Sequence, residues 1–327
     1  MQRGQIKNAG LVTRARAATA ISHRTISPNA LSPQRCVALT ERGTQSNRIE
    51  NIQALYINLD QELGRRDFVQ EQLANVGIAG RRINAVDGSK PLPPELARYF
   101  SPKHVMSAGA LGCYASHIMA WQEITLQRLP YALVLEDDAI LDQNFARILV
   151  DLLRALPPDW DMVHLSAEPD RVVRPVAKLT DDRTLVRYSR IPSGTAGYLI
   201  SAAGAQKMLL ANEPRVWPVD TDTRRPWLFC LNVYGLTTAP IRQNRKMPST
   251  IRPRGRKPRT RRRGLRAAFG NPIRNLESFR FNFGKLGPHW WLRCLITNGL
   301  KKSAALLRSL RQRVVTLRPK HVHASRT

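Results

Sequence analysis

Short apolar runs alternate with segments of helical periodicity along the central part of the chain. Runs of strand length lie at residues 53–59, 83–86, 131–141, 161–166 and 195–201, and segments that read as helices lie at residues 65–76, 109–126, 145–156 and 202–210. Strands and helices that alternate in this order predict an α/β fold, with a parallel or mixed central sheet and helices on both of its faces.

The pattern changes beyond about residue 241, where basic side chains dominate. Residues 251–266 are too basic and too rich in proline and glycine to form a core of their own. Further on, apolar side chains return at helical spacing with arginines between them, which predicts a basic amphipathic helix over residues 306–318.

Charge divides the 327 residues in the same way. The chain has 52 Lys and Arg against 24 Asp and Glu, a net charge of +28. Residues 1–50 carry +6, residues 51–240 carry −1 and residues 241–327 carry +23. We therefore expect a basic, disordered extension over residues 1–50, a near-neutral catalytic domain over residues 51–245 and a polybasic tail over residues 246–327.

Composition excludes several classes of protein. No run of 18 or more apolar residues is present, so we expect no membrane-spanning helix, and the first 50 residues lack the apolar core of a secretory signal. The four cysteines are scattered without a CxxC pair, which indicates a reduced, cytoplasmic protein without a structural zinc site.

Three adjacent carboxylates, Glu136, Asp137 and Asp138, follow directly on the apolar run 132–135. Carboxylates at the end of a buried strand repel one another, and a bound cation compensates that repulsion. Oxygen ligands suit Mg²⁺ or Mn²⁺, which neutralise a diphosphate. The alternative is a solvated turn before the next helix, with Asp142 as its N-cap.

Four segments, in this order, resemble glycosyltransferase family 25, the family of bacterial lipopolysaccharide galactosyltransferases and their collagen galactosyltransferase relatives. They are YINLDQELGRRDFVQEQL with AVDG, then GALGCYASHIMAWQEI, then YALVLEDDAIL, then GTAGYLISAAGAQKML followed by PVDTD. The resemblance covers residues 52–245. It implies a GT-A-like fold, a nucleotide-sugar donor such as UDP-galactose, and transfer with inversion at the sugar.

The resemblance also assigns roles to residues. The triplet Glu136, Asp137 and Asp138 would hold the divalent metal in place of a DxD motif, and EDD leaves open which of the three are ligands. The nucleotide would lie at Asn58 and Asp60, with Arg65 or Arg66 on phosphate, and further contacts are expected from Asp87, Gly88, Gly194 and Thr195. For Arg65 and Arg66 a solvated helix start is the alternative. For Asp87 and Gly88 the alternative is a simple turn, and for Gly194 and Thr195 it is a turn into a strand.

An inverting transfer needs a general base that takes the proton of the acceptor hydroxyl. Asp220 and Asp222 are the candidates, against the alternative of solvated acids in a loop. His117 lies in the SH pair of the family pattern, and a hydrogen-bonded, packed histidine is its alternative.

Two other functions compete with the enzyme. The high charge fits a nucleic-acid-binding protein, but the tail has few interleaved aromatic residues and the body has no recognisable nucleic-acid-binding module. A carbohydrate-binding relative that has lost catalysis is the second. We expect the basic tail to attract the anionic cytoplasmic face of the inner membrane, where a lipid-linked glycan acceptor would lie.

Overall fold

The computed structural model describes residues 52–211, 214–247 and 272–297. Within these ranges an eight-stranded sheet has the order β2-β1-β3-β8-β5-β9-β7-β6, and β10 and β4 form a separate pair. The strands are β1 (Ala54–Asn58), β2 (Gly80–Asn84), β3 (Tyr131–Glu136), β4 (Ala139–Leu141), β5 (Met162–His164), β6 (Val173–Lys178), β7 (Thr184–Tyr188), β8 (Gly197–Ser201), β9 (Val233–Leu236) and β10 (Ile241–Gln243).

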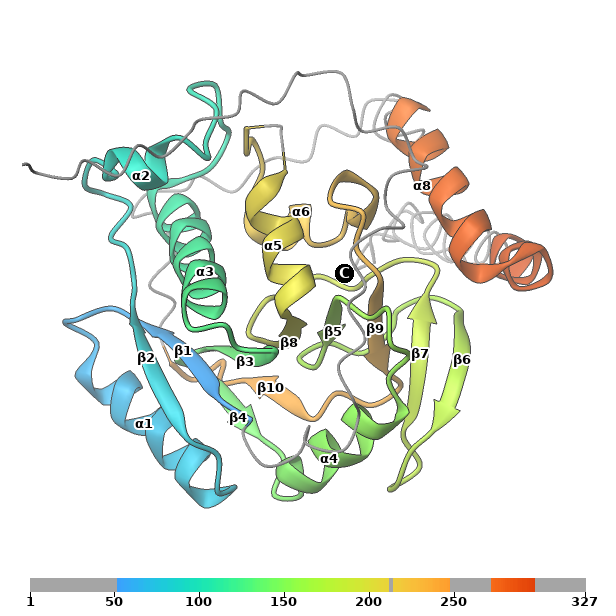
Figure 1. The fold of residues 1–327 in the computed structure, drawn as a ribbon, viewed down its shortest axis with the longest axis horizontal. Coiled ribbons are helices and arrows are strands. Elements are labelled where there is room, and N and C mark those ends of the chain that lie inside the picture. Colours follow the sequence, from blue (N-terminus) through green and yellow to red (C-terminus); the bar gives the residue numbers. More distant parts are fainter. Residues whose placement is uncertain (1–51, 212–213, 248–271, 298–327) are drawn as a thin grey trace, which may run out of the picture. The chain divides into compact units, whose positions relative to one another are not determined.

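Helices cover both faces of this sheet (Figure 1). The helical elements are α1 (Leu63–Asn75), α2 (Pro94–Ala97), α3 (Ala108–Leu126), α4 (Phe145–Ala155), α5 (Ala202–Leu210), α6 (Val219–Asp222), the 3-10 helix η3 (Pro226–Leu228) and α8 (Pro272–Leu286). One apolar core packs α3 and α5 against one face, and a second packs α1 and α4 against the other. The alternation of apolar runs therefore predicted the α/β class and the two covered faces correctly.

The sheet is mixed in direction. β1 pairs in parallel with both β2 and β3, whereas β8 and β7 run against their neighbours. Strands β1 and β3 are apolar and buried up to their last residues, Asn58 and Glu136, as expected for strands with helices on both faces. Their carboxyl ends lie side by side, and this is where ligands bind in open α/β sheets.

The run at residues 131–141 is two strands rather than one. β3 ends at Glu136, the chain turns at Asp137 and Asp138, and β4 leaves the main sheet to pair with β10. The following helix begins at Phe145, beyond β4, with Asn144 as its N-cap. The carboxylate triplet therefore lies at a turn between two strands and does not cap a helix.

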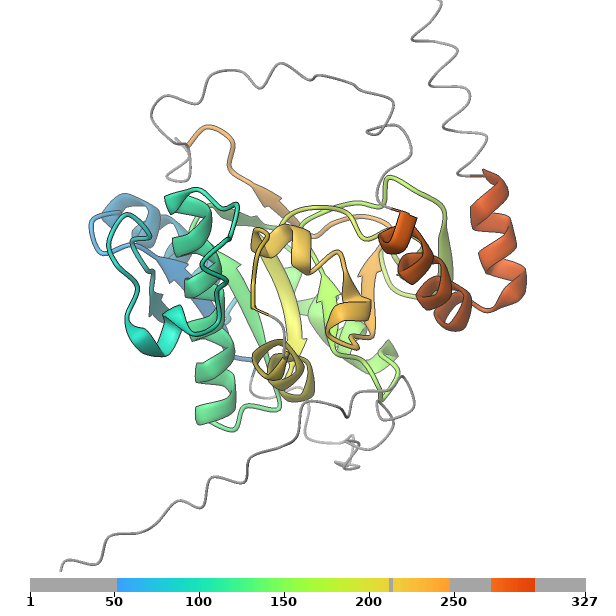
Figure 2. The same ribbon diagram turned by 90° about the horizontal axis from the view of Figure 1, so that it is seen from above.

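Residues 272–297, which fall within the predicted polybasic tail, are helical and contact the body. The carbonyl oxygen of Leu286 accepts a hydrogen bond from Arg174 at 3.0 Å, and Trp227 donates to Glu277 at 3.1 Å. Residues 288–297 form a further helical segment beside α8 (Figure 2), where Phe279 and Trp291 meet edge to face. The predicted amphipathic helix over residues 306–318 and the extension over residues 1–50 lie outside the described residues.

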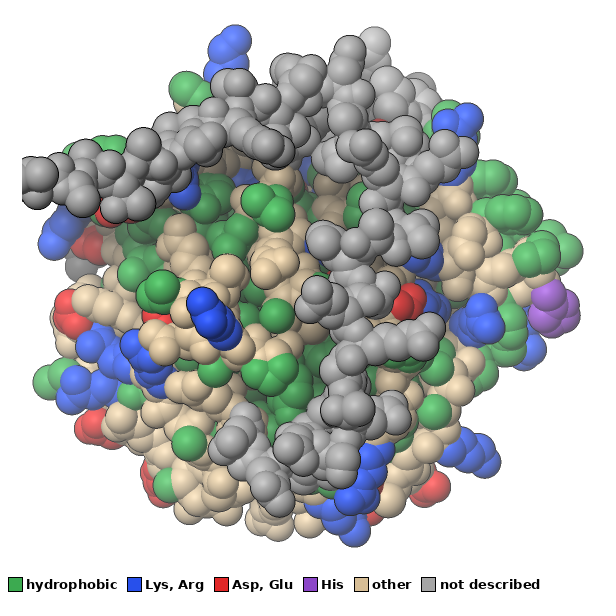
Figure 3. Space-filling view, viewed as in Figure 1, with side chains coloured by type: hydrophobic (Ala, Val, Ile, Leu, Met, Phe, Trp, Pro, Cys, Tyr) green, Lys and Arg blue, Asp and Glu red, His purple; other side chains and the backbone are tan. Residues whose placement is uncertain are grey.

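Hydrophobic side chains gather on the outer surface of these C-terminal helices, at the right of Figure 3. The exposed ones are Leu276, Phe279, Phe283, Leu292, Leu295 and Ile296. None of the helices in the described ranges combines the length and the apolar character that crossing a membrane requires.

Candidate active site

A pocket of about 120 Å³ lies at the carboxyl ends of β1 and β3. Because β1 and β3 are parallel neighbours with Ile57 opposite Glu136, the residues that follow each strand come together. The pocket brings together eight of the residues predicted from the sequence: Asn58, Arg65, Asp87, Gly88, His117, Glu136, Asp137 and Asp138.

Asp137 is held by protein groups on both of its carboxylate oxygens. Arg65 Nε donates to Oδ1 at 2.8 Å, and Asn58 Nδ2 donates to Oδ2 at 2.8 Å. Both Arg65 and Asp137 are buried. A charge-assisted pair of this kind orients the carboxylate rigidly and leaves it little capacity for another ligand.

Asp138 is less completely satisfied. Its Oδ2 accepts a hydrogen bond from Gln243 at 3.1 Å and lies 3.2 Å from Arg65 Nη2. Its Oδ1 is buried and has no hydrogen-bond partner among the described residues. Burial, followed by the charge of Glu136, raises the pKa of Asp138. A cation at Oδ1 would supply the missing partner of this oxygen and would offset the repulsion between Asp138 and Glu136. The oxygen donors present therefore fit a divalent metal.

Burial argues against a solvated turn as the interpretation of the triplet. Asp137 is 7% exposed and Asp138 is 6% exposed. Carboxylates enclosed to this degree are not a solvated turn, and buried charges persist in proteins when they are paired or bind metals.

A chain of hydrogen bonds orients His117 toward Glu136. Trp121 Nε1 can only donate, and it donates to the Tyr198 hydroxyl at 2.9 Å. That hydroxyl lies 2.9 Å from His117 Nδ1, and we assign the hydroxyl proton to this contact, since the indole nitrogen of Trp121 cannot accept it. A proton of the imidazole then lies on Nε2, 3.7 Å from Glu136 Oε1.

Glu136 lies at the end of this series of hydrogen-bonded side chains. Thr195 Oγ1 donates to Glu136 Oε1 at 2.7 Å. Burial would raise the pKa of Glu136, but His117, Thr195 and the charge of Arg65 together hold it below its ordinary value. The site therefore contains an ionised, oriented Glu136 next to an immobilised Asp137 and an incompletely satisfied Asp138.

Gly88 and Gly112 let the loop after β2 lie directly against α3. A Cβ on Gly88 would lie 2.0 Å from the Ala108 carbonyl oxygen, and a Cβ on Gly112 would lie 2.3 Å from the Val86 carbonyl oxygen. Ser116 Oγ accepts from the Val86 amide at 2.8 Å and closes this contact. The Asp87 carboxylate, one residue along, accepts from the Ser89 amide, as expected for the predicted turn.

The other predicted residues lie outside this pocket. Asp60 is mostly exposed and pairs with Arg82 and Asn84. Thr195 contacts the site by its hydrogen bond to Glu136. Gly194, the residue before it, has a φ of +123°, a backbone conformation that favours glycine. Arg66 lies 3.8 Å from its neighbour Asp67 rather than in the pocket.

The two acids of α6 have different surroundings. Asp222 is 3% exposed, and its carboxylate accepts from the Tyr114 hydroxyl at 3.0 Å and pairs with Arg225 at 3.3 Å. Asp220 is half-buried, and its charge acts on Cys113, a residue of the pocket. Asp220 thus has the freer carboxylate of the two.

Sequence reasoning missed Gln243, Tyr198 and Trp121 as parts of the site. Gln243 is 105 residues from Asp138 and reaches it only because β10 pairs with β4. Tyr198 and Trp121 lie within segments that carry the family resemblance, but no local pattern indicates that their side chains meet at His117.

Comparisons with known proteins identify the family of this chain. The profile of glycosyltransferase family 25 (LPS biosynthesis protein) matches residues 51–223. Procollagen galactosyltransferase 1 of Danio rerio is 33% identical over 193 residues, which cover 54% of this chain and 31% of that protein. Procollagen galactosyltransferase 2 of Homo sapiens is 32% identical over 184 residues, covering 50% and 28%.

A third relative carries a different description. The probable inactive glycosyltransferase 25 family member 3 of Bos taurus is 29% identical over 184 residues, covering 50% of this chain and 30% of that protein. The chain thus matches about a third of the length of these relatives. Among solved structures, a glycosyltransferase involved in glycosylation of the PBCV-1 major capsid aligns with a TM-score of 0.30 and 14% identity, covering 50% of this chain and 68% of that one.

Proposed function

Because this chain belongs to glycosyltransferase family 25, we propose that it transfers a sugar, galactose in the first instance, from a UDP-sugar to a cell-envelope glycan such as lipopolysaccharide core. The transfer would invert the anomeric centre in one displacement. The acceptor oxygen bonds to the anomeric carbon as the bond to the diphosphate oxygen breaks, and the acceptor proton passes to a carboxylate of the protein.

The observation that carries this proposal is the buried Oδ1 of Asp138, which has no hydrogen-bond partner among the described residues. We assign Asp138 as the principal ligand of a Mn²⁺ or Mg²⁺ ion, with Glu136 beside it. When bound, the ion neutralises charge on the diphosphate leaving group. Asp137, although it belongs to the same triplet, is held by Arg65 and acts by fixing the turn.

Asn58, Asp87 and Gly88 line the side of the pocket formed by β1 and β2, and we assign them to the nucleotide. Arg65 is buried between Asp137 and Asp138, so it serves first to hold the carboxylates and second as a nearby positive charge for phosphate. Asp60, paired with Arg82 at the surface, would contribute through that arginine.

Asp220 is our candidate for the general base, because the carboxylate of Asp222 is already engaged by Tyr114 and Arg225. His117 fits this role less well, since its Nδ1 accepts from Tyr198 and its Nε2 proton faces Glu136. We therefore assign His117 to holding Glu136 in place.

A donor screen tests the enzyme directly. Release of UDP from a set of UDP-sugars would be measured with Mn²⁺ and with EDTA, for the wild type, Asp138→Asn and the control Asp67→Asn. Asp67 is 72% exposed on α1, so its variant should match the wild type. We expect the loss of Asp138 to lower turnover by about 10²-fold or more.

Absence of metal-dependent turnover or hydrolysis with every nucleotide sugar would contradict the proposal. Retention of UDP binding in that case would instead support the alternative of a carbohydrate-binding relative without catalysis. If the wild type depends on metal and Asp138→Asn keeps full activity, the assignment of Asp138 as the principal metal ligand is wrong.

We further propose that the enzyme is cytoplasmic and works at the anionic inner face of the membrane. Residues 241–327 carry a net charge of +23, and the helical residues 272–297 expose Phe283, Leu292 and Ile296 among other apolar side chains. Basic side chains combined with an exposed apolar face are the properties of segments that lie in a membrane interface.

A further inference from the structure

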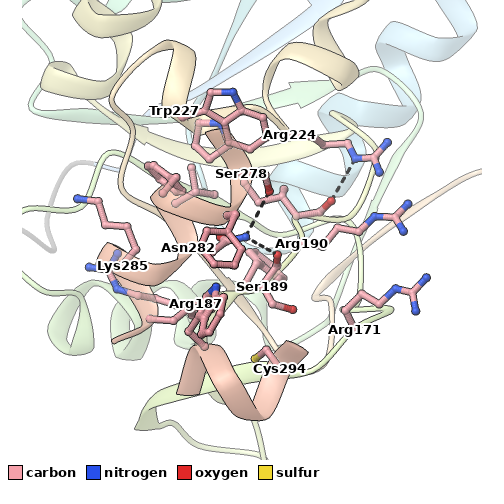
Figure 4. A pocket seen from close by; sticks show the side chains of 18 of the residues that line it. Arg171, Arg187, Ser189, Arg190, Arg224, Trp227, Ser278, Asn282, Lys285 and Cys294 are labelled. Carbon is pink, nitrogen blue, oxygen red and sulfur yellow. Dashed lines mark hydrogen bonds between the residues drawn. The ribbon is translucent and has the colours of Figure 1, made fainter. Parts of the chain in front are cut away.

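A second and larger pocket of about 490 Å³ lies between the body and the C-terminal helices (Figure 4). Its walls come from the end of β7, from η3 and from α8 with the helical residues after it. The volume is within the range of pockets that hold small ligands.

Positive charge dominates this basic pocket. Five cationic side chains line it, and none of its described lining residues is acidic; the cations are Arg171, Arg187, Arg190, Arg224 and Lys285. Figure 4 shows Arg171, Arg190 and Arg224 in a row on one side, with Lys285 and Arg187 on the other.

The acidic side chains nearby compensate only part of this charge. Asp170, 53% exposed, lies 4.0 Å from Arg171 and 3.9 Å from Arg190, and these distances are at the outer limit of an ion pair. Asp159 lies 3.9 Å from Arg187, whose guanidinium stacks over the Tyr234 ring at 4.3 Å. The two carboxylates are about half exposed, and ion pairs of this length contribute little.

Lys285 is affected by its burial and by a neighbouring cation of the pocket. Burial, followed by the charge of Arg187, lowers the pKa of Lys285. An anion between these side chains would relieve that repulsion, and arginine forks bind phosphate and carboxylate in two-point contacts.

Specific contacts hold the walls in place. Asn282 on α8 donates to the Ser189 carbonyl oxygen at 3.0 Å, and Arg224 donates to the Ile191 carbonyl oxygen at 3.1 Å. Trp227 is tied to Glu277 of α8 and packs at 6.2 Å from the Phe281 ring. The pocket is thus preformed, with aromatic rings beside its charges.

The backbone connects this pocket to the candidate active site. Ser189, Arg190 and Ile191 line the basic pocket, and Thr195 donates to Glu136. Three residues separate Ile191 from Thr195, so the four Cα–Cα steps between them place these two Cα atoms at most about 14 Å apart. An oligosaccharide of a few sugars spans that distance.

We propose that the basic pocket binds an anionic sugar of the acceptor, one that carries phosphate or carboxylate, while the hydroxyl to be glycosylated lies at Glu136 and Asp138. This inference rests on the proposed function, because it names the acceptor class of the same enzyme. A compact pocket fits one or two sugars, whereas single-stranded nucleic acid is bound in grooves that follow several nucleotides.

The test compares charged and neutral oligosaccharides on the full chain. Tetragalacturonate carries carboxylates, and maltotetraose is the neutral control of equal length; glucose 6-phosphate and glucose form the phosphate pair. Binding would be followed by calorimetry and by tryptophan fluorescence for the wild type, Arg190→Glu, Lys285→Gln and the control Arg154→Glu. Arg154 is exposed on α4, which packs in the other apolar core.

We expect the charged ligands to bind the wild type and Arg154→Glu, and binding to weaken about tenfold or more in the two pocket variants. Added NaCl should weaken it as well. Donor hydrolysis should be unchanged in all four proteins, which also shows that the variants are folded.

Three results would overturn the inference: equal binding of charged and neutral sugars, binding that the pocket variants leave unchanged, or tighter binding of oligouridylate that depends on the same two residues. If donor hydrolysis is intact and any of these results is obtained, the assignment of the basic pocket to the acceptor is contradicted, whereas the proposed function is not. Absence of donor hydrolysis by the wild type would instead contradict the proposed function.

Discussion

At the scale of single residues, orientation matters as much as identity. His117 and Glu136 are both ordinary acid–base groups, but the direction of hydrogen bonding from Trp121 through Tyr198 determines which nitrogen of His117 carries the proton. Partners of this kind, one step removed from the reacting groups, typically change activity 10- to 100-fold when they are lost.

Tyr198→Phe tests this hydrogen-bond chain. Without the hydroxyl, His117 Nδ1 loses its donor and the imidazole is free to change tautomer, so we expect turnover to fall about 10-fold. The steady-state rate of UDP release, with kcat and KM separated, measures this effect. Tyr56→Phe is the matched control, because its hydroxyl bonds Gln70 on the opposite face of the sheet. Equal losses in the two variants would show that Tyr198 is merely structural.

At the scale of elements, the packing of α3 against the loop after β2 positions the pocket. Ser107 caps α3 by accepting a hydrogen bond from the Ala110 amide, and Gly88 meets Gly112 one turn into the helix. The contact brings Asp87 and His117, which come from different elements, to the same pocket.

Gly112→Ala should disrupt that packing. The added methyl group would lie 2.3 Å from the Val86 carbonyl oxygen and 2.6 Å from the Gly88 nitrogen, so backbone must move. We expect a loss of about 2 kcal/mol in the free energy of unfolding, measured by urea denaturation. Gly64→Ala is the control: nothing lies within 4 Å of its added Cβ in α1, and it should stabilise the protein by about 0.5 kcal/mol. Unchanged stability of Gly112→Ala would show that α3 can shift without cost.

At the scale of the whole molecule, most of the excess positive charge lies in a later stretch of the sequence than the candidate active site. Residues 51–240 are close to neutral, and the positive charge follows them in the sequence. The described C-terminal helices add both an exposed apolar surface and part of the basic pocket. We therefore infer that one region of the chain serves both acceptor binding and membrane attachment.

Cosedimentation with vesicles tests membrane attachment. We expect the full chain to pellet with vesicles that contain anionic lipid and to remain in solution with neutral vesicles, because each basic residue near an anionic surface contributes about 1 kcal/mol. Replacement of Arg261, Arg262 and Arg263 by Gln should weaken pelleting, as should Leu292→Gln with Ile296→Gln. Leu210→Gln, a change at an exposed leucine of α5, is the control. Equal pelleting of all variants would contradict the proposal.

The sequence by itself determined the α/β class, the main strands and helices, and the position of three carboxylates at the end of a buried strand. These features depend on local periodicity and on the turn chemistry of neighbouring residues, so they can be read along the chain. The structure confirmed the strand at residues 53–59 and the helices at residues 65–76 and 109–126 to within a few residues, and it divides the run at residues 131–141 into two strands. Strands β6, β7, β9 and β10 were missed, because they are short or carry mixed side chains.

Only the tertiary structure decided how each carboxylate is held. Asp137 and Asp138 are adjacent and chemically identical, yet Arg65 and Asn58 engage both oxygens of the first, while the second keeps an oxygen without a hydrogen-bond partner among the described residues. The basic pocket likewise exists only because residues near 171, 190, 224 and 285 meet in space. Contacts between residues so far apart depend on how the elements pack, and no local pattern in a single sequence contains that information.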